Sequence, residues 1–230
     1  MYIQILQYKF MLKYLLPLLA ISTLFSCAPT RFVKPLADGG HAVNVAVGGP
    51  LFEFGKLVIP MPLLSAAYGY GVDSTLTAFG GVNITSGVYG NAQIDLGVTK
   101  QLFKQSGAVP AVSITPVANF IYRNKDAKKF YPQLDVHAFW EFNQRRNFLY
   151  AGISNWFELS GKKAHDQEQT NHWLVTPQIG QTFVREKWDF TIEAKFLAPN
   201  ISYESNVVDY KSPLGKRGAF GIYFGYTRKF

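Results

Sequence analysis

The chain is poor in cysteine and in charge, and it contains no long apolar run after its first 25 residues. A single cysteine among 230 residues excludes a disulfide-stabilised scaffold. Charged residues make up 17% of the chain against 48% hydrophobic residues, which excludes a disordered acidic or basic tail. No later segment approaches the ~20 apolar residues that a membrane helix requires. What the chain does have is 16% aromatic residues and 20 glycines, in a length that suits one domain.

The first 26 residues have the features of an export signal. They contain no acidic residue, and residues 12–25 are apolar over about the length of a signal-peptide core. Lys9 and Lys13 supply positive charge at the start of this core, and Met11 offers an alternative start with a shorter signal. We therefore expect residues 1–26 to be removed on export.

The sole cysteine lies at the end of this signal. Residues 24–27 read LFSC, which resembles the lipobox of bacterial lipoproteins, in which the cysteine receives a lipid. The resemblance implies an acyl anchor such as palmitate on Cys27, followed by a lipid-anchored periplasmic linker over residues 27–39. Ala28 is not the aspartate that retains many lipoproteins in the inner membrane, which implies sorting to the outer membrane. The alternative is an ordinary cleaved signal with a coincidental cysteine.

From residue 40 onwards the sequence alternates with a period of two, which is typical of strands that have two different faces. For example, Trp188 and Ile192 share one face of an expected strand, whereas Thr191 and Glu193 share the other. Strands of about 10–14 residues match the 9–11 residues that a tilted strand needs to cross a bilayer. We predict that residues 40–230 form an all-β, antiparallel up-and-down barrel of about ten strands. The expected strands are 40–49, 63–72, 75–85, 89–103, 109–122, 131–143, 147–157, 172–184, 187–198 and 218–230.

The connections between these strands alternate in length. The long ones are all odd-numbered along the chain, namely 50–62, 123–130, 158–171 and 199–217, and 86–88 is the short exception among them. Outer-membrane barrels join their strands by short periplasmic turns and longer outer loops. The chain also ends on Phe230 in an alternating run, which resembles the terminal-strand signal of Gram-negative outer-membrane barrels. Arg228 departs from that signal, because an apolar residue is usual at its position.

The face opposite the apolar one is rich in Gly, Ser, Thr, Asn and Gln rather than in Lys and Glu. This composition suits a polar lumen within an apolar outer belt, and aromatic residues near the strand ends suit interfacial girdles. Pro116 and Pro177 fall within expected strands, where we expect bulges or bends. A few charges are predicted to face the lumen and to plug it by pairing, because buried charges need partners. They are Asp95, Asp135, Glu141, Glu193 and Lys195.

Few residues indicate chemistry. His137 lies one strand step from Asp135, and Ser154 lies on the next strand, so the three could form a nucleophilic set. Membrane-embedded lipid A deacylases and acyltransferases use such sets, but a polar lumen without catalysis is the simpler interpretation. The seventh connection holds potential metal ligands, for which a solvated loop is again simpler, so we predict no metal and no cofactor. These ligands are His165, Asp166, Glu168 and His172.

Basic residues gather in the connections that we expect on the outer side. They could bind the phosphates of lipopolysaccharide, and solvation of the loops is the alternative. Nucleic acid is not an expected partner of an exported barrel, despite the pI of about 9.4. These residues are Lys56, Arg123, Lys125, Lys128, Lys129, Lys162, Lys163, Lys211, Lys216 and Arg217.

Taken together, these patterns predict a small outer-membrane β-barrel lipoprotein that contacts outer-membrane lipids. Its expected role is structural or one of surface interaction, with a plugged lumen and no enzymatic activity. Three alternatives remain open from the sequence. They are a lipid-modifying enzyme, a narrow pore, and a soluble periplasmic barrel that binds an apolar ligand.

Overall fold

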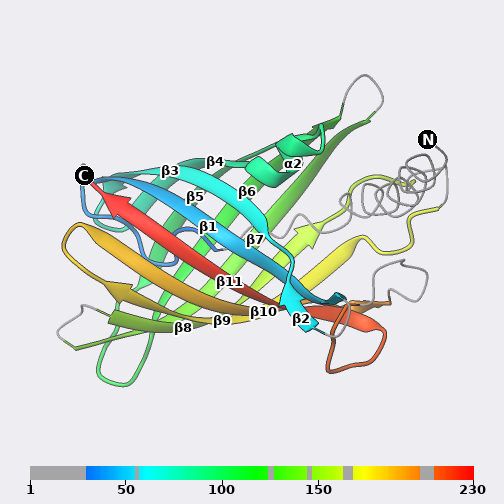
Figure 1. Ribbon diagram of the computed structural model, residues 1–230. Coiled ribbons are helices and arrows are strands. Elements are labelled where there is room, and N and C mark those ends of the chain that lie inside the picture. The colour runs from blue at the N-terminus through cyan, green and yellow to red at the C-terminus, as the bar shows by residue number, and fades with distance from the viewer. Residues whose placement is uncertain (1–29, 55–56, 124–126, 144–146, 163–167, 203–209) are drawn as a thin grey trace, which may run out of the picture.

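The alternating segments form a closed antiparallel barrel (Figure 1). This computed structural model describes residues 30–54, 57–123, 127–143, 147–162, 168–202 and 210–230, and all structural statements below concern those residues. Eleven strands share one sheet, of which β2 pairs only with β1, so the barrel wall has ten. The elements are β1 (His41–Phe54), β2 (Leu57–Pro60), β3 (Leu63–Asp73), β4 (Leu76–Asn83), α2 (Ile84–Val88), β5 (Ala92–Phe103), β6 (Ala111–Arg123), β7 (Ala127–Phe142), β8 (Asn147–Phe157), β9 (Trp173–Val184), β10 (Trp188–Ser202) and β11 (Arg217–Lys229).

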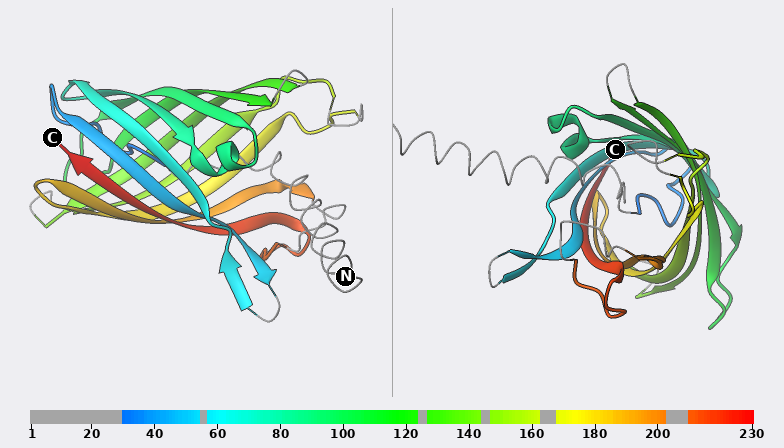
Figure 2. Two further views of the ribbon diagram at one scale, coloured as in Figure 1. Left: turned by 45° about the horizontal axis from the view of Figure 1, so that its top comes forward. Right: turned by 90° about the vertical axis from the view of Figure 1, so that its right-hand side faces the viewer.

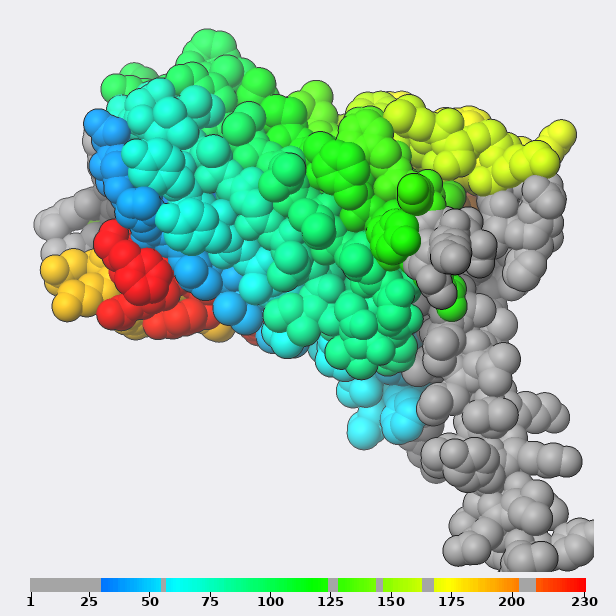
Figure 3. All heavy atoms as spheres, turned by 90° about the horizontal axis from the view of Figure 1, so that it is seen from above, coloured from blue at the N-terminus to red at the C-terminus, as the bar shows by residue number. Residues whose placement is uncertain are grey.

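The first and last strands of the wall close the barrel. β1 pairs with β11 from Ala42↔Lys229 to Pro50↔Gly221, and the Phe230 N–H donates to the His41 carbonyl at 2.9 Å. Closure satisfies the backbone groups that an open sheet edge would leave unpaired, which matters most in lipid. β2 and the end of β1 form a hairpin that projects from the rim (Figures 2 and 3).

The ten predicted strands are confirmed, although several of their ends differ from the expected positions, and three of these differences have a visible cause. β1 continues to Phe54 because β2 pairs with its last four residues. The connection expected at 86–88 contains the short helix α2, whose first turn is capped by the Asn83 side chain accepting from the Ser86 N–H at 2.9 Å. The connection expected at 123–130 is largely strand, because β6 and β7 remain paired as far as Arg123↔Ala127.

Pro116 and Pro177, the two prolines for which bulges or bends were expected, coincide with breaks in pairing, which agrees with their missing N–H. Around Pro116, the β5–β6 ladder is interrupted between the pairs Gly97↔Val117 and Lys100↔Ile114. The β9–β10 ladder ends at the pair Lys195↔Gln178, and Gln178 directly follows Pro177, which has no partner on β10. Each proline therefore lies at a position where one neighbouring strand forms no backbone hydrogen bond with it, so its missing N–H leaves no acceptor unpaired on that side.

The assignment of faces is confirmed. Ile94, Leu96 and Ile192 point outward and are 46%, 55% and 40% exposed, whereas Asp95 and Glu193, one residue away, are each 2% exposed. Apolar side chains therefore cover the outside of the wall and polar ones line its interior. This is the inverse of a water-soluble barrel.

The two ends of the barrel differ. At the turn end, strands are joined by residues 74–75, 104–110, 143–146 and 185–187, and Phe230 lies beside the start of β1. At the loop end lie the paired strands β1 and β2, α2, the end of β6 and the start of β7, and residues 158–162, 168–172 and 210–216. Within the described residues, no helix has the length and apolar character needed to cross a membrane.

Residues 30–40 correct the sequence-based expectation of a periplasmic linker over 27–39. They lie inside the ring of strands, as the view along the barrel shows (Figure 2). Phe32 and Val33 are each 5% exposed, because the wall supplies apolar and polar partners that a linker in water would lack. We call residues 30–40 the inner segment.

Candidate functional site: the occupied lumen

Arg31 attaches the inner segment to three neighbouring strands. Its Nη2 lies 2.8 Å from Asp95 Oδ1 on β5, and its Nη1 donates to the Ala66 carbonyl on β3 at 2.9 Å. Gly81 on β4 makes room for the guanidinium, because a Cβ there would lie 2.4 Å from Nη1. The Arg31 and Asp95 side chains are only 4% and 3% exposed, so water screens this ion pair little.

Strand hydroxyls satisfy the backbone of the inner segment. Thr99 Oγ1 donates to the Phe32 carbonyl at 2.8 Å, and Ser113 Oγ donates to the Val33 carbonyl at 2.7 Å. Buried backbone groups need such partners, and the inner segment has no β-ladder of its own to provide them. The small polar residues that sequence analysis placed on the lumen face thus bind a peptide backbone.

The lumen also has an apolar half. The Phe32 ring lies 5.7 Å from that of Phe79 and packs on Gly69, where a Cβ would lie 2.6 Å from the ring. Val33 packs against a mainly aromatic cluster from β6, β7 and β8, made up of Ala111, Phe139, Phe148 and Tyr150. The prediction of a plug of polar side chains was therefore incomplete, because a peptide segment and aromatic rings fill much of the lumen.

Towards the turn end, the segment is held by a second cation and by backbone contacts. Lys34 Nζ lies 2.8 Å from Glu141 Oε2. The Leu36 N–H donates to Thr77 Oγ1 at 2.7 Å. These contacts end where the inner segment leads into β1 at His41.

Thr30 joins a polar network in the opposite wall. Its N–H donates to Glu193 Oε1 at 3.1 Å, and its hydroxyl donates to Gln178 Oε1 at 3.0 Å. Glu193 also accepts from the Tyr150 hydroxyl at 2.7 Å and lies 3.2 Å from Lys195 Nζ. The carboxylate is thus fully paired by wall and segment together.

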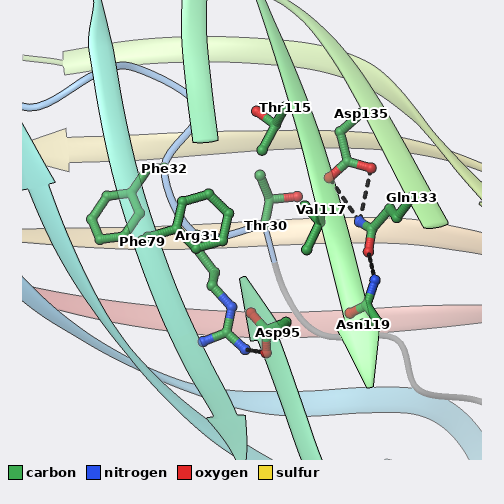
Figure 4. A pocket seen from close by; sticks show the side chains of 10 residues that line it. All are labelled: Thr30, Arg31, Phe32, Phe79, Asp95, Thr115, Val117, Asn119, Gln133 and Asp135. Carbon is green, nitrogen blue, oxygen red and sulfur yellow. Dashed lines mark hydrogen bonds and ion pairs between the residues drawn. The ribbon is translucent and has the colours of Figure 1, made fainter. Parts of the chain in front are cut away.

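A small pocket lies beside Thr30 and Arg31 (Figure 4). Polar side chains from β6 and β7 form its far wall, where Gln133 Nε2 donates to both Asp135 oxygens, at 2.8 and 2.9 Å. Gln133 Oε1 in turn accepts from Asn119 Nδ2 at 3.0 Å. The pocket is a polar space left between the inner segment and the wall.

The five predicted lumen charges all face the interior, but their pairing differs from the expected one. Only Glu193 and Lys195 pair with each other. Asp95 and Glu141 pair with cations of the inner segment, and Asp135 is held by an amide.

The three candidate catalytic residues lie on adjacent strands but are not hydrogen-bonded to one another. Asp135 and Ser154 are cross-strand neighbours, yet Gln133 donates to both of them. His137 is fully buried, and its Nε2 lies 2.5 Å from Gln178 Nε2. The arrangement is a packed polar network. His137, the candidate base, is hydrogen-bonded neither to the candidate nucleophile Ser154 nor to the carboxylate of Asp135.

Only two of the four candidate metal ligands, Glu168 and His172, lie among the described residues. His165 and Asp166 lie outside the described residues, and the described residues contain no group of three or more potential ligands. His172 Nδ1 instead lies 2.8 Å from the Glu158 carbonyl.

The basic residues of the loop end divide into paired and exposed ones. Lys129 pairs with Glu158 at 3.0 Å and Lys211 pairs with Glu53, whereas Arg123 and Lys128 are exposed on the β6–β7 hairpin. Lys56, Lys125 and Lys163 lie outside the described residues.

Sequence analysis missed Arg31, Phe32 and Lys34, which it placed in a linker. One signal could have pointed to them. The predicted lumen had four carboxylates and one ammonium, an imbalance that a closed, low-dielectric interior cannot hold without further cations.

Comparisons with known proteins identify the architecture. No protein-family model and no curated protein matches the chain. An outer-membrane channel from Pseudomonas putida F1 superposes with a TM-score of 0.50 at 9% identity, over 89% of this chain and 100% of that one. The NanC porin gives 0.46 at 9% identity, over 83% and 100% of the two chains. The translocator domain of the autotransporter NalP from Neisseria meningitidis gives 0.43 at 10% identity, over 86% and 91%. At such identities the likeness concerns the fold alone, and that fold is the closed antiparallel barrel of outer-membrane proteins.

Proposed function

We propose that the protein is a small integral β-barrel of the bacterial outer membrane, lipidated at Cys27 and closed by its own inner segment. Its role is structural or interactive: it presents the loop end on one side of the membrane rather than conducting solutes through its lumen. The observation that carries the proposal is an apolar outer surface around a lumen filled by residues 30–36.

The outer surface supports a place in lipid. Exposed apolar side chains follow the outward face of every wall strand, from Val45 and Val47 on β1 to Phe224 on β11. Aromatic residues such as Tyr122 and Trp173 lie near the loop end, and Trp188 and Tyr226 stack near the turn end. Aromatic belts at both interfaces are typical of membrane barrels.

The filled lumen favours a closed barrel over a pore. A ten-stranded barrel has little interior to spare, and here a peptide segment and aromatic rings occupy it. The enzymatic alternative lacks the required geometry, because no hydrogen bond joins His137 to Ser154 or to Asp135.

Membrane lipids are the proposed partners of the outer surface. Arg123 and Lys128 are the described basic residues that remain exposed on the projecting β6–β7 hairpin, where lipopolysaccharide phosphates would be within reach.

The test is a solubility experiment on a chain without its proposed lipid. Cys27→Ser should abolish incorporation of labelled palmitate, yet the folded protein should still need detergent to stay dispersed. Continued labelling would end the lipidation proposal. A folded, monodisperse Cys27→Ser protein in the absence of detergent would instead favour the soluble ligand-binding barrel.

A matched pair of variants tests the faces in the same chain. Ile192→Arg puts a charge into hydrocarbon and should cost about 2–4 kcal/mol of unfolding free energy near the bilayer midplane. Thr191→Arg points into the lumen, where Glu193 lies nearby, and it should assemble more readily in lipid vesicles.

A further inference from the structure

An unpaired arginine lies on the outer face of the wall at the turn end. Arg228 is exposed and follows the buried Thr227 on β11, so its side chain points outward like that of Tyr226. Among the residues that the structure describes, no group forms a hydrogen bond or an ion pair with its guanidinium. The next cation along the chain, Lys229, pairs instead with Asp189 at 2.8 Å. The arginine that departs from the terminal-strand signal is therefore free to bind a partner outside the chain.

The neighbours of Arg228 on the outer face leave space beside it. The strands β10, β11, β1 and β3 are consecutive in the wall (Figure 1). At the height of Arg228 they carry Trp188 on β10, Val43 on β1 and Tyr68 on β3. Two strand spacings, about 9–10 Å, separate the backbones of Arg228 and Tyr68, with only a valine between them. The Tyr68 hydroxyl is hydrogen-bonded to His41 Nδ1, and a hydroxyl can accept from an imidazole while it donates to an anion.

A second guanidinium approaches the same indole ring. Arg185, in the turn before β10, has its Cζ 5.7 Å from the centre of the Trp188 ring, within the range of a cation–π contact. Its Nη1 donates to the Val184 carbonyl at 2.8 Å, and no described carboxylate forms an ion pair with it. Glu186 and Lys187, both exposed in that turn, are of opposite charge. The positive charge of the two arginines therefore remains unbalanced on the outer face.

These residues lie at the level where lipid headgroups meet the hydrocarbon. Trp188 is the first residue of β10, and Arg228 is one residue before the end of β11. Ile192 and Phe224, four residues further along the same strands, belong to the exposed apolar belt. Tryptophan and tyrosine rings favour the headgroup level, and a long arginine side chain can keep its charge there.

An apolar strip leads from Arg228 towards the middle of the membrane. The outward residues of β1 are Val43, Val45 and Val47, and the last two are exposed. On β11 they are flanked by Tyr226 and Phe224, which are larger. A molecule with a charged head and an apolar tail would match this surface, with its head at the arginines and its tail along the valines.

We propose that Arg228, Arg185 and Tyr68 bind the phosphate of a glycerophospholipid in the leaflet at the turn end, with an acyl chain lying along the valines of β1. A guanidinium binds phosphate oxygens in a bidentate manner, and the indole of Trp188 forms the apolar side of the site. The proposal rests on the proposed membrane location and names a lipid partner for one place on the outer surface. The short turns of outer-membrane barrels are periplasmic, so the site faces the leaflet opposite to lipopolysaccharide.

The test measures lipid retention by the full-length protein in detergent. Phosphatidylglycerol is added, and native mass spectrometry gives the fraction of protein that retains one lipid. We expect Arg228→Gln to weaken retention about tenfold, the effect of losing one charge-assisted hydrogen bond. Arg228→Lys should fall between the two, because lysine keeps the charge but lacks the planar fork. Arg123→Gln, which removes an exposed arginine at the loop end, is the matched control and should retain the lipid as wild type does.

Heat-modifiable migration in gels shows that each variant has folded. Equal retention by wild type and Arg228→Gln would overturn the proposed site, and so would an equal loss in Arg123→Gln, which would indicate unspecific attraction of charge. The same series with lipopolysaccharide tests the source of the phosphate. A loss of lipopolysaccharide but not of phosphatidylglycerol in Arg228→Gln would overturn the assignment to a glycerophospholipid. Wild-type protein that stays folded and monodisperse without detergent would instead overturn the proposed membrane location itself.

Discussion

At the scale of single residues, the lumen is organised by charge. Each cation of the inner segment meets a carboxylate of the wall, Arg31 with Asp95 and Lys34 with Glu141. The carboxylates could be predicted from strand periodicity, since Asp95 and Glu141 fall on the polar faces of alternating runs. Their partners could not, because residues 31 and 34 lie outside any periodic run, and nothing local shows that they face the lumen.

The Arg31–Asp95 pair should be worth far more than an ion pair at the rim. Removing one partner of a buried pair leaves the other charge unpaired, so Arg31→Met should lower the free energy of unfolding by about 3–5 kcal/mol. Urea unfolding in lipid vesicles measures this. Lys211→Met, which breaks an exposed pair with Glu53, serves as the control and should cost less than about 1 kcal/mol. Equal effects of the two variants would show that the lumen pair is hydrated.

Glu158, beyond the end of β8, supplies a pH-dependent contact at the loop end. Partial burial alone would raise its pKa, but hydrogen bonds from Ser160 and the ion pair with Lys129 together lower the pKa below its usual value. A lowered pKa in the folded state means that this contact stabilises the fold above the unfolded pKa and is lost as the pH falls through the folded one. In Lys129→Met we expect the Glu158 pKa to rise, which carboxyl-resolved NMR in micelles detects. An unchanged pKa would show that the lysine contributes nothing.

At the scale of elements, alternation alone was enough to predict the wall. Strands such as β8 and β9 begin and end within one residue of the expected positions, because polar and apolar faces require opposite environments at every second residue. Helix α2 and the paired ends of β6 and β7 were not predictable in this way. They depend on a cap at Asn83 and on cross-strand contacts beyond the barrel rim.

The inner segment has no regular backbone hydrogen bonding. It fits against the wall because glycines there, which have no side chain, leave room for it. Gly69→Ala places a Cβ about 2.6 Å from the Phe32 ring, and such overpacking typically costs about 1–3 kcal/mol. Unfolding measurements should show this loss in Gly69→Ala and little further loss when Gly69→Ala is added to Phe32→Ala. Gly225→Ala is the matched control, because its nearest atoms would lie at 3.5 and 3.6 Å. Strict additivity of the first two substitutions would mean that the ring does not pack on Gly69.

At the scale of the whole molecule, the barrel has a wall that is negative towards its lumen and a segment that compensates it. Without the segment, the predicted lumen charges leave four carboxylates against the ammonium of Lys195. The segment therefore both fills the interior and balances its charge.

Removal of residues 30–37 should convert the closed barrel into a cation-preferring conductor. The full chain should be silent in planar bilayers, whereas the shortened chain should pass current with a reversal potential that favours cations. Heat-modifiable migration in gels provides the check that the shortened barrel has folded. A folded, shortened barrel that remains silent would show that the aromatic cluster alone closes the lumen.

The seam between β1 and β11 has a consequence for the order of assembly. It joins residues 42 and 229, almost the full length of the chain apart, so it can form only when the last strand has been delivered. The inner segment continues directly into β1, on one side of that same seam. Once the seam is shut, the packed interior offers no way in for residues 30–40. The wall must therefore close around a segment that is already in place, and the segment acts as a template on which the cylinder is wrapped.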